Sequence, residues 1–178
     1  MINLVIIPIL LIIFFLLIFV ILAFLLFVFD AFLDLPYVAT DRKKINTIVK
    51  FANIRHGQTI VDLGSGDGRL LIAAAQQGAK AVGYELNPLL IAVTLIHAKI
   101  KGLSNSVWVE RKNLWKADLK VADVIFVYGR SRTMKKFEDF VFKSAKKDTL
   151  IIVNTDKTVP FPNKKPAKQE NGIYLYIV

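Results

Sequence analysis

Hydrophobic residues form one long block near the start of the chain. From Leu4 to Phe29 the sequence is almost entirely Leu, Ile, Phe and Val, and it contains no charged side chain. A helix needs roughly 20 apolar residues to cross the core of a bilayer, whereas a buried core helix would show polar punctuation or an amphipathic face. A cleaved signal peptide has a shorter apolar region between basic and small residues. We therefore predict that residues 1–34 form a retained N-terminal transmembrane anchor.

From residue 35 onward the pattern changes to short elements separated by turn residues. Pro36 restricts its predecessor to an extended conformation, and Thr40 is placed to cap a helix that begins at Asp41. Short β-branched apolar runs predict strands at residues 59–63, 81–85, 107–110, 123–128 and 149–153. Helical spacing and end signals predict helices at residues 69–77, 88–101 and 133–144. The final run, residues 173–178, is predicted to be an edge strand.

This alternation predicts a single α/β domain over residues 35–178. Strands that are apolar throughout are typical of a mostly parallel sheet with helices on both faces. In such sheets the ligand binds beyond the carboxyl ends of the strands, where the strand order reverses. We therefore expect a Rossmann-like fold, preceded by one transmembrane helix, with its site at this edge of the sheet.

A glycine-rich turn follows the first predicted strand. Gly64, Gly66 and Gly68 allow the backbone to turn tightly and to approach a ligand closely. The helix that follows offers unpaired backbone N–H groups. A dinucleotide fingerprint has the spacing GxGxxG, but the position of its third glycine is Arg69 here. The spacing indicates a nucleotide-like cofactor and weakens the case for a nicotinamide.

Three carboxylates accompany this turn. Glu85 ends the second predicted strand, where a carboxylate can accept hydrogen bonds from two ribose hydroxyls. Asp62 and Asp67 add negative charge on either side of the first glycines. Because like charges repel at short range, the arrangement favours a cationic sulfonium over a pyrophosphate.

The segment after the third predicted strand supplies a further candidate contact. Asn113 can hydrogen-bond an adenine edge while Leu114 or Trp115 packs on the ring, although Trp115 fits a core position equally well. Two isolated histidines and no cysteine give no metal constellation. No nucleophile has a recognisable base beside it. We therefore expect neither a metal site nor covalent catalysis.

The formal net charge of +10 lies on the residues that follow the hydrophobic block. A basic domain is attracted to an anionic leaflet. We favour this over nucleic-acid binding, because the lysines are scattered and no aromatic-rich strand face accompanies them. Positive residues close to a span also indicate its cytoplasmic side; here they are Arg42, Lys43, Lys44, Lys50 and Arg55. We expect a single-pass cell-membrane protein with its domain in the cytoplasm.

The ordered motifs resemble those of class I S-adenosylmethionine-dependent methyltransferases. Residues 61–68, Val-Asp-Leu-Gly-Ser-Gly-Asp-Gly, resemble motif I of that family, and Gly83-Tyr84-Glu85 resembles its acidic motif II. More narrowly, the chain is similar to the membrane-anchored protein-lysine methyltransferases of mitochondria, which modify the adenine nucleotide translocase and the ATP synthase c subunit, and to their prokaryotic relatives. The similarity also includes the hydrophobic block and residues 36–40, 67–69, 85–88, 113–115 and 128–129.

The resemblance implies a class I methyltransferase fold and S-adenosylmethionine as cofactor. The cofactor-binding residues that it implies are Asp62, Gly64, Ser65, Gly66, Asp67, Gly68, Glu85, Asn113, Leu114 and Trp115. It places Tyr37, Thr40 and Tyr128 beside a substrate channel for a lysine, most readily a lysine of a membrane protein. The chain departs from the family pattern at Ala39, at Asp41 and at the basic segment 130–132.

Other functions stay open at this point. Methylation of a lipid, a quinone or another small membrane molecule would need the same cofactor site. A nicotinamide oxidoreductase is opposed by Arg69. A non-catalytic module tethered to the membrane would share the anchor and the fold. We expect a membrane-anchored methyltransferase that acts on a protein lysine.

Overall fold

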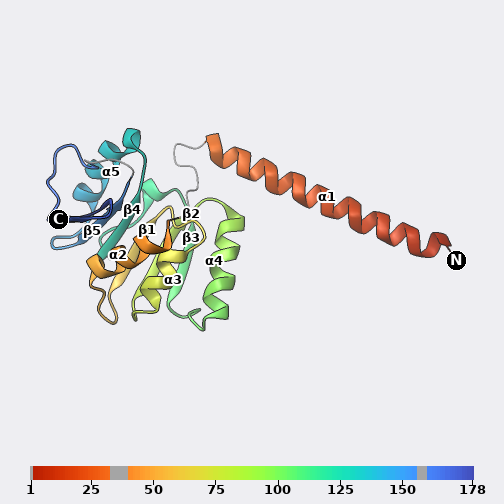
Figure 1. Cartoon of the computed structure of the whole chain (residues 1–178), viewed down its shortest axis with the longest axis horizontal. Helices are drawn as coiled ribbons and strands as arrows, with labels where there is room; N and C mark the ends of the chain where they lie inside the picture. The colour runs from red at the N-terminus through yellow and green to blue at the C-terminus, as the bar shows by residue number, and fades with distance from the viewer. Residues whose placement is uncertain (1, 33–39, 156–159) are drawn as a thin grey trace. The chain divides into compact units, whose positions relative to one another are not determined.

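The computed structural model describes residues 2–32, 40–155 and 160–178, and the chain divides into two compact units. The first unit, Met1–Pro36, contains helix α1 (Ile2–Phe32), and the second, Tyr37–Val178, contains the sheet (Figure 1). Within α1 the segment Ile6–Leu25 is long and apolar enough to cross a membrane, by length and composition alone, and none of it is buried in the protein.

Seven strands form one sheet in the second unit. Their order is β3-β2-β1-β4-β5-β7-β6. The strands are β1 (Thr59–Leu63), β2 (Lys80–Glu85), β3 (Val107–Arg111), β4 (Val124–Tyr128), β5 (Leu150–Asn154), β6 (Lys168–Glu170) and β7 (Ile173–Ile177). The first five run parallel, and β7 is antiparallel to both β5 and β6. The order reverses at β1, which lies between β2 and β4, so the carboxyl end of β1 is where a ligand is expected.

Helices cover both faces of the sheet, as predicted (Figure 1). Helices α2 (Arg42–Ala52), α3 (Arg69–Ala75) and α4 (Pro88–Ile100) share one buried cluster with alternate residues of the strands, such as Phe126. The neighbouring residues of the same strands point to the opposite face, toward α5 (Ser131–Ser144), which follows β4.

Two predicted details were wrong. The C-terminal strand β7 is not an edge strand, because the short β6 pairs with its outer side. Strand β6 reads Lys-Gln-Glu, so it has no apolar alternation that would have revealed it. Helix α2 is capped by Asp41 and not by Thr40, since the Asp41 side chain accepts a hydrogen bond from the Lys43 N–H at 2.7 Å.

The connection from β3 to β4 is compact. Among its residues, all of which the structure describes, only the short 3₁₀ helix η1 (Leu114–Lys116) is helical. Trp108 on β3 therefore keeps 44% of its surface exposed. The connection lies directly against β2 instead, where the Asp118 N–H donates to the Tyr84 hydroxyl at 3.3 Å. This path brings η1 close to the glycine turn after β1.

Candidate active site

The glycine turn after β1 has a backbone that other residues rarely adopt. Gly64, Gly66 and Gly68 have φ values of +89°, +56° and +74°. The N–H groups of Gly64 and Ser65 both donate to the Tyr84 carbonyl, at 3.0 and 3.1 Å, so the turn is tied to the end of β2. The turn predicted from the sequence is therefore present, and three positive φ angles explain its glycines.

Close packing adds a second constraint on the turn. A Cβ atom at Gly68 would overlap the side chain of Thr94 in α4. The Thr94 hydroxyl lies there because it donates to the Gly66 carbonyl at 3.2 Å. A Cβ at Gly83 on β2 would lie 2.5 Å from the Ser65 hydroxyl oxygen, which is buried. The side chain of Ser65 thus fills the space between the backbone of the turn and β2.

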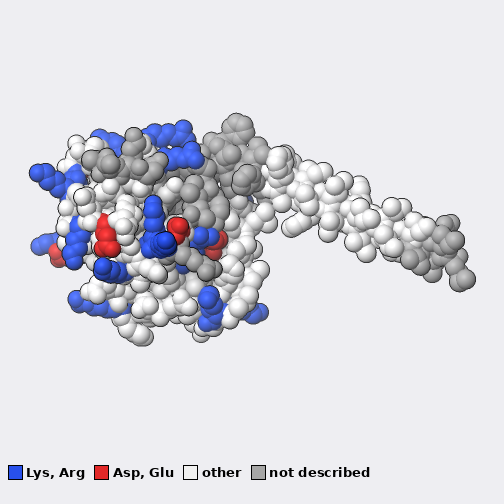
Figure 2. Space-filling view, viewed as in Figure 1, with Lys and Arg blue, Asp and Glu red and all other residues white. Residues whose placement is uncertain are grey.

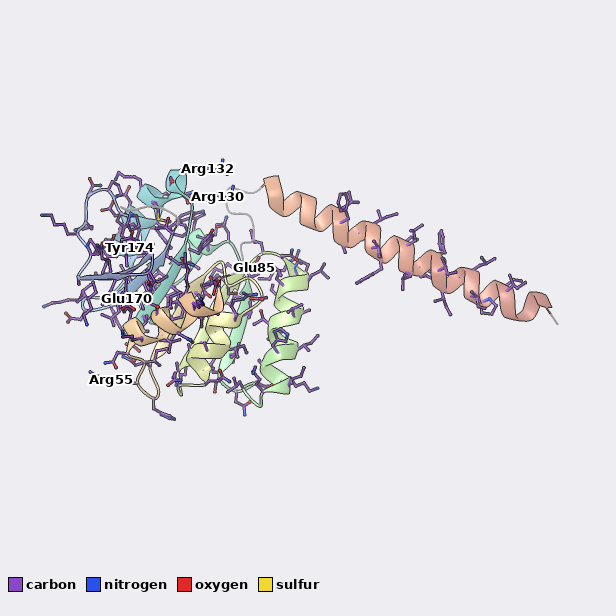
Figure 3. The ribbon with its side chains drawn as sticks, viewed as in Figure 1. Arg55, Glu85, Arg130, Arg132, Glu170 and Tyr174 are labelled. Carbon is purple, nitrogen blue, oxygen red and sulfur yellow. The ribbon has the colours of Figure 1, made fainter. Side chains whose placement is uncertain are left out.

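Backbone amides hold Glu85 at the end of β2 (Figure 3). One carboxylate oxygen accepts the Gly66 N–H at 2.9 Å, and the other accepts the N–H groups of Leu86 and Asn87 at 2.7 and 2.9 Å. Hydrogen bonds from N–H groups to a carboxylate are stronger than those between neutral groups. The carboxylate is therefore fixed beside the glycine turn, as the sequence predicts.

Asp62 is buried at the end of β1. Burial raises the pKa of this carboxyl from its ordinary 3.8 to about 7, and the charges of Glu85 and Asp67 raise it as well. Three carboxylates thus share one small region, and the innermost one resists ionisation. A positive charge placed among them would relieve this repulsion.

Arg69 connects the glycine turn to the start of the domain. Its guanidinium forms an ion pair with Asp67, with a shortest distance of 2.6 Å, and its Nη1 donates to the Thr40 carbonyl at 2.7 Å. Both groups of the ion pair are partly shielded from water, with 34% of the Arg69 and 19% of the Asp67 side chain exposed. Arg69, which replaces the third glycine of the dinucleotide fingerprint, therefore holds the Asp67 carboxylate and the backbone before α2 together.

The same network continues to the end of β5. The Asn154 side-chain amide donates to the Thr40 hydroxyl at 3.5 Å, and its oxygen accepts from Lys44 Nζ at 3.1 Å. Both Thr40 and Asn154 are buried. Tyr128 ends β4 and is paired in register with Asn154. The structure thus brings together two of the three predicted channel residues, Thr40 and Tyr128, while Tyr37 lies outside the described residues.

The three residues of the 113–115 segment lie in different surroundings. The side-chain oxygen Oδ1 of Asn113 caps η1 by accepting the Trp115 N–H at 3.0 Å. Leu114 lies over the turn, with its Cδ2 3.7 Å from the place of a Cβ at Gly64. Trp115 packs on α5, with its ring 4.5 Å from that of Phe137. Leu114 therefore borders the glycine turn, and Trp115 is half-buried against α5.

Sequence reasoning missed several members of this site, namely Thr94, Asn154, Lys44 and the bridging role of Arg69. Asn154 offered a signal, because it is a polar residue at the end of an otherwise apolar strand. The contacts of Thr94 and Lys44 join segments far apart in the chain and leave no local pattern. Within the described residues, no group of three or more histidine, aspartate or glutamate side chains could hold a metal ion.

Comparison with known proteins gives consistent matches. The family described as the ANTKMT methyltransferase domain matches residues 62–168. The human lysine N-methyltransferase of the ATP synthase c subunit is 35% identical over 132 residues, which are 74% of this chain and 55% of that protein. The chain thus spans about half the length of this relative.

Two further matches cover nearly the whole of the compared protein. A protein-lysine N-methyltransferase of Saccharolobus islandicus (strain REY15A) is 26% identical over 151 residues, which are 81% of this chain and 94% of that protein. The crystal structure of an RNA methyltransferase from Salinibacter ruber, in complex with S-adenosyl-L-homocysteine, superposes with a TM-score of 0.71. It is 26% identical and covers 79% of this chain and 93% of its own.

The overlap at Gly68 gives a first prediction. Gly68→Ala combines a left-handed backbone with a clash against Thr94, whereas Gly102→Ala, at φ +68°, meets open space. The backbone term costs about 1–2 kcal/mol in both variants, and the clash adds about 1–3 kcal/mol at position 68 only. Thermal unfolding of the full chain in detergent micelles measures the difference. Equal losses would show that Thr94 does not limit the turn.

The buried Asp62 predicts a pH dependence of stability. Its pKa is about 7 in the folded protein and near 3.8 in the unfolded chain. Between these values the folded state holds more protons, so the free energy of unfolding falls as the pH rises and levels off above 7. Asp62→Asn should flatten this fall in thermal unfolding, while Asp118→Asn, at an exposed carboxyl, should leave it unchanged. An unaltered slope in Asp62→Asn would contradict the assignment.

Removal of the Arg69 bridge should loosen the backbone around Thr40 and Asp67. Arg69→Met keeps much of the side-chain volume but removes the hydrogen bonds to Asp67 and the Thr40 carbonyl. For partly exposed groups this should cost about 1–2 kcal/mol. Hydrogen exchange measured by mass spectrometry should then quicken in peptides containing Thr40 and Asp67. Arg55→Met, at an exposed turn, serves as the control, and unchanged exchange near Thr40 in Arg69→Met would refute the bridge.

Proposed function

The chain belongs to the family of the ANTKMT methyltransferase domain and has the class I methyltransferase fold, and on this premise we propose that it is an S-adenosylmethionine-dependent protein-lysine methyltransferase anchored in a membrane. The observation that carries the proposal is the glycine turn with Glu85 fixed beside it at the reversal point of the sheet. The names of the relatives support the choice of acceptor.

The residues around the turn fit S-adenosylmethionine. Glu85 would accept hydrogen bonds from the ribose hydroxyls, and Leu114 would pack on the adenine beside the backbone of Gly64. Asp62 and Asp67 would supply negative charge for the sulfonium and ammonium groups. When bound, the cofactor supplies a methyl group activated by the positive sulfur. The chain's part is to position the acceptor and to keep water out.

The acceptor side is proposed to lie at the ends of β4 and β5. A lysine amine must lose its proton before it can act as a nucleophile, and its reference pKa is about 10.4. Transfer into a site with little water lowers that pKa. The Thr40 hydroxyl and the Asn154 carboxamide are buried polar groups that could orient the amine, with Tyr128 beside them. Tyr37 is proposed as a further channel residue on the family resemblance alone.

We propose a membrane protein as the substrate and the bilayer as a partner. The apolar segment of α1 would confine the domain to the membrane surface, and confinement raises the effective concentration of any acceptor in the same membrane. The basic residues between 42 and 55 favour the cytoplasmic side. Scattered charge without an aromatic strand face still disfavours nucleic acid, and methylation of a lipid or quinone is the alternative that a test must separate.

Glu85 provides the test of cofactor binding. Glu85→Ala should weaken the binding of S-adenosylmethionine by about 1.5–3 kcal/mol, roughly ten- to a hundredfold in Kd. Calorimetry on the full chain in micelles measures it. Glu110→Ala removes an exposed carboxylate from the neighbouring strand and should bind as the wild type does. Failure of the wild type to bind the cofactor would end the proposal.

The same variants identify the acceptor. Native membranes incubated with the protein and radiolabelled cofactor should yield a labelled protein band that releases methyl-lysine on acid hydrolysis, and Glu85→Ala should label weakly. Label only in the organic extract would support a lipid or quinone acceptor, and label in RNA would overturn the proposal of a protein acceptor.

Sealed cells test the proposed cytoplasmic orientation of the domain. Cells that express the protein should stay unlabelled until they are opened, because the cofactor does not cross the bilayer.

A further inference from the structure

Helix α4 carries hydrophobic side chains on the side that faces away from the sheet. Its inner side is closed by Thr94 and Ala98, which are almost completely buried. On its outer side Val93, Ile96 and Ile100 expose 37%, 56% and 76% of their surfaces. Residues with this spacing lie on one face of a helix. A surface helix of a water-soluble domain normally carries polar residues there, so this outer stripe (Val93, Ile96 and Ile100) indicates a contact with an apolar medium.

The charged side chains that α4 itself carries are all positive. No aspartate or glutamate occurs between residues 86 and 109. Lys99 and Lys101 are exposed at the C-terminal end of α4. At its other end Arg111 of β3 donates from Nε to the Leu86 carbonyl at 3.4 Å. Figure 2 shows the flank of the domain formed by α4 as largely uncharged, with basic residues near one end.

We propose that the outer stripe of α4 lies in the headgroup region of an anionic bilayer. An apolar face bordered by lysine and arginine is the pattern of helices that lie in the plane of a membrane surface. The helix has 13 residues, too few to cross the bilayer, and its inner side remains on the sheet. The inference rests on the membrane anchoring proposed above. Only residues 33–39 separate the end of α1 from Thr40, and so short a link holds a domain at the membrane surface.

This contact would involve the glycine turn directly. Helix α4 begins three residues after Glu85, and its Thr94 donates to the Gly66 carbonyl. The helix that touches the lipid is therefore the helix that holds the turn. Membrane contact by α4 would keep the cofactor edge of the sheet next to the headgroups. The acceptor would then be a lysine that a membrane protein presents at the level of the lipid headgroups.

Single fluorescent labels can test the placement, because the chain contains no cysteine. Ile96→Cys and Ile100→Cys carry an environment-sensitive label on the outer stripe, and Lys143→Cys carries it on the exposed side of α5 as the matched control. The full chain is reconstituted into vesicles of phosphatidylcholine and phosphatidylglycerol that contain nitroxide lipids. The labels at 96 and 100 should show blue-shifted, quenched emission. The label at 143 should not. Omitting the anionic lipid or raising the salt should reduce the quenching.

Every outcome decides the question. Quenching at 96 and 100 but not at 143 supports the proposal, whereas equal quenching at all three positions, or none, overturns it. Density-dependent cross-linking between cysteines at position 96, without quenching, would assign the stripe to a second copy of the chain and would also overturn it. Carbonate extraction of the same vesicles reports on the anchor separately. If the protein stays in the membrane pellet but its labels are not quenched, the proposed anchor is supported and only the proposed role of α4 is refuted.

Discussion

The contact between Gly68 and Thr94 is the constraint on which the rest of the site depends. The backbone of the turn and the helix α4 approach so closely that no Cβ fits between them, and the Thr94 hydroxyl then binds the Gly66 carbonyl. Because α4 packs on β2 and β3, this contact sets the turn relative to the sheet. In this arrangement the Gly66 N–H donates to the Glu85 carboxylate at 2.9 Å. Protein interiors resist such displacements because they are close-packed.

The site concentrates negative charge and treats each carboxylate differently. Glu85 is held by three backbone amides, and Asp67 is paired with Arg69. Burial of Asp62, together with the charges of Glu85 and Asp67, raises its pKa to about 7. Two carboxylates are thus stabilised as anions by the protein itself, and the third is left for a positive ligand to stabilise. Carboxyl groups with such perturbed pKa values are typical of functional sites.

The sequence predicts what is local and periodic. The parallel strands, the glycine turn and Glu85 follow from runs of apolar residues and from glycine spacing, and the structure confirms the fold. Strand β6 was missed because three polar residues carry no strand signal. The bridge from Asp67 through Arg69 to Thr40 was missed because it joins residues 29 positions apart through a backbone carbonyl. The surroundings of Trp115 could not be predicted, because its ring packs on Phe137 of α5 and the residues near position 115 give no sign of that contact.

The compact connection between β3 and β4 has a consequence for how such a domain can diversify. A parallel crossover commonly carries an α-helix, whereas this one has a single 3₁₀ turn that passes beside the glycine turn. Trp108 stays uncovered as a result. An inserted segment at this point would have no helix to displace and would lie next to the glycine turn. Sequence added to this loop would therefore lie beside the glycine turn at little cost to folding.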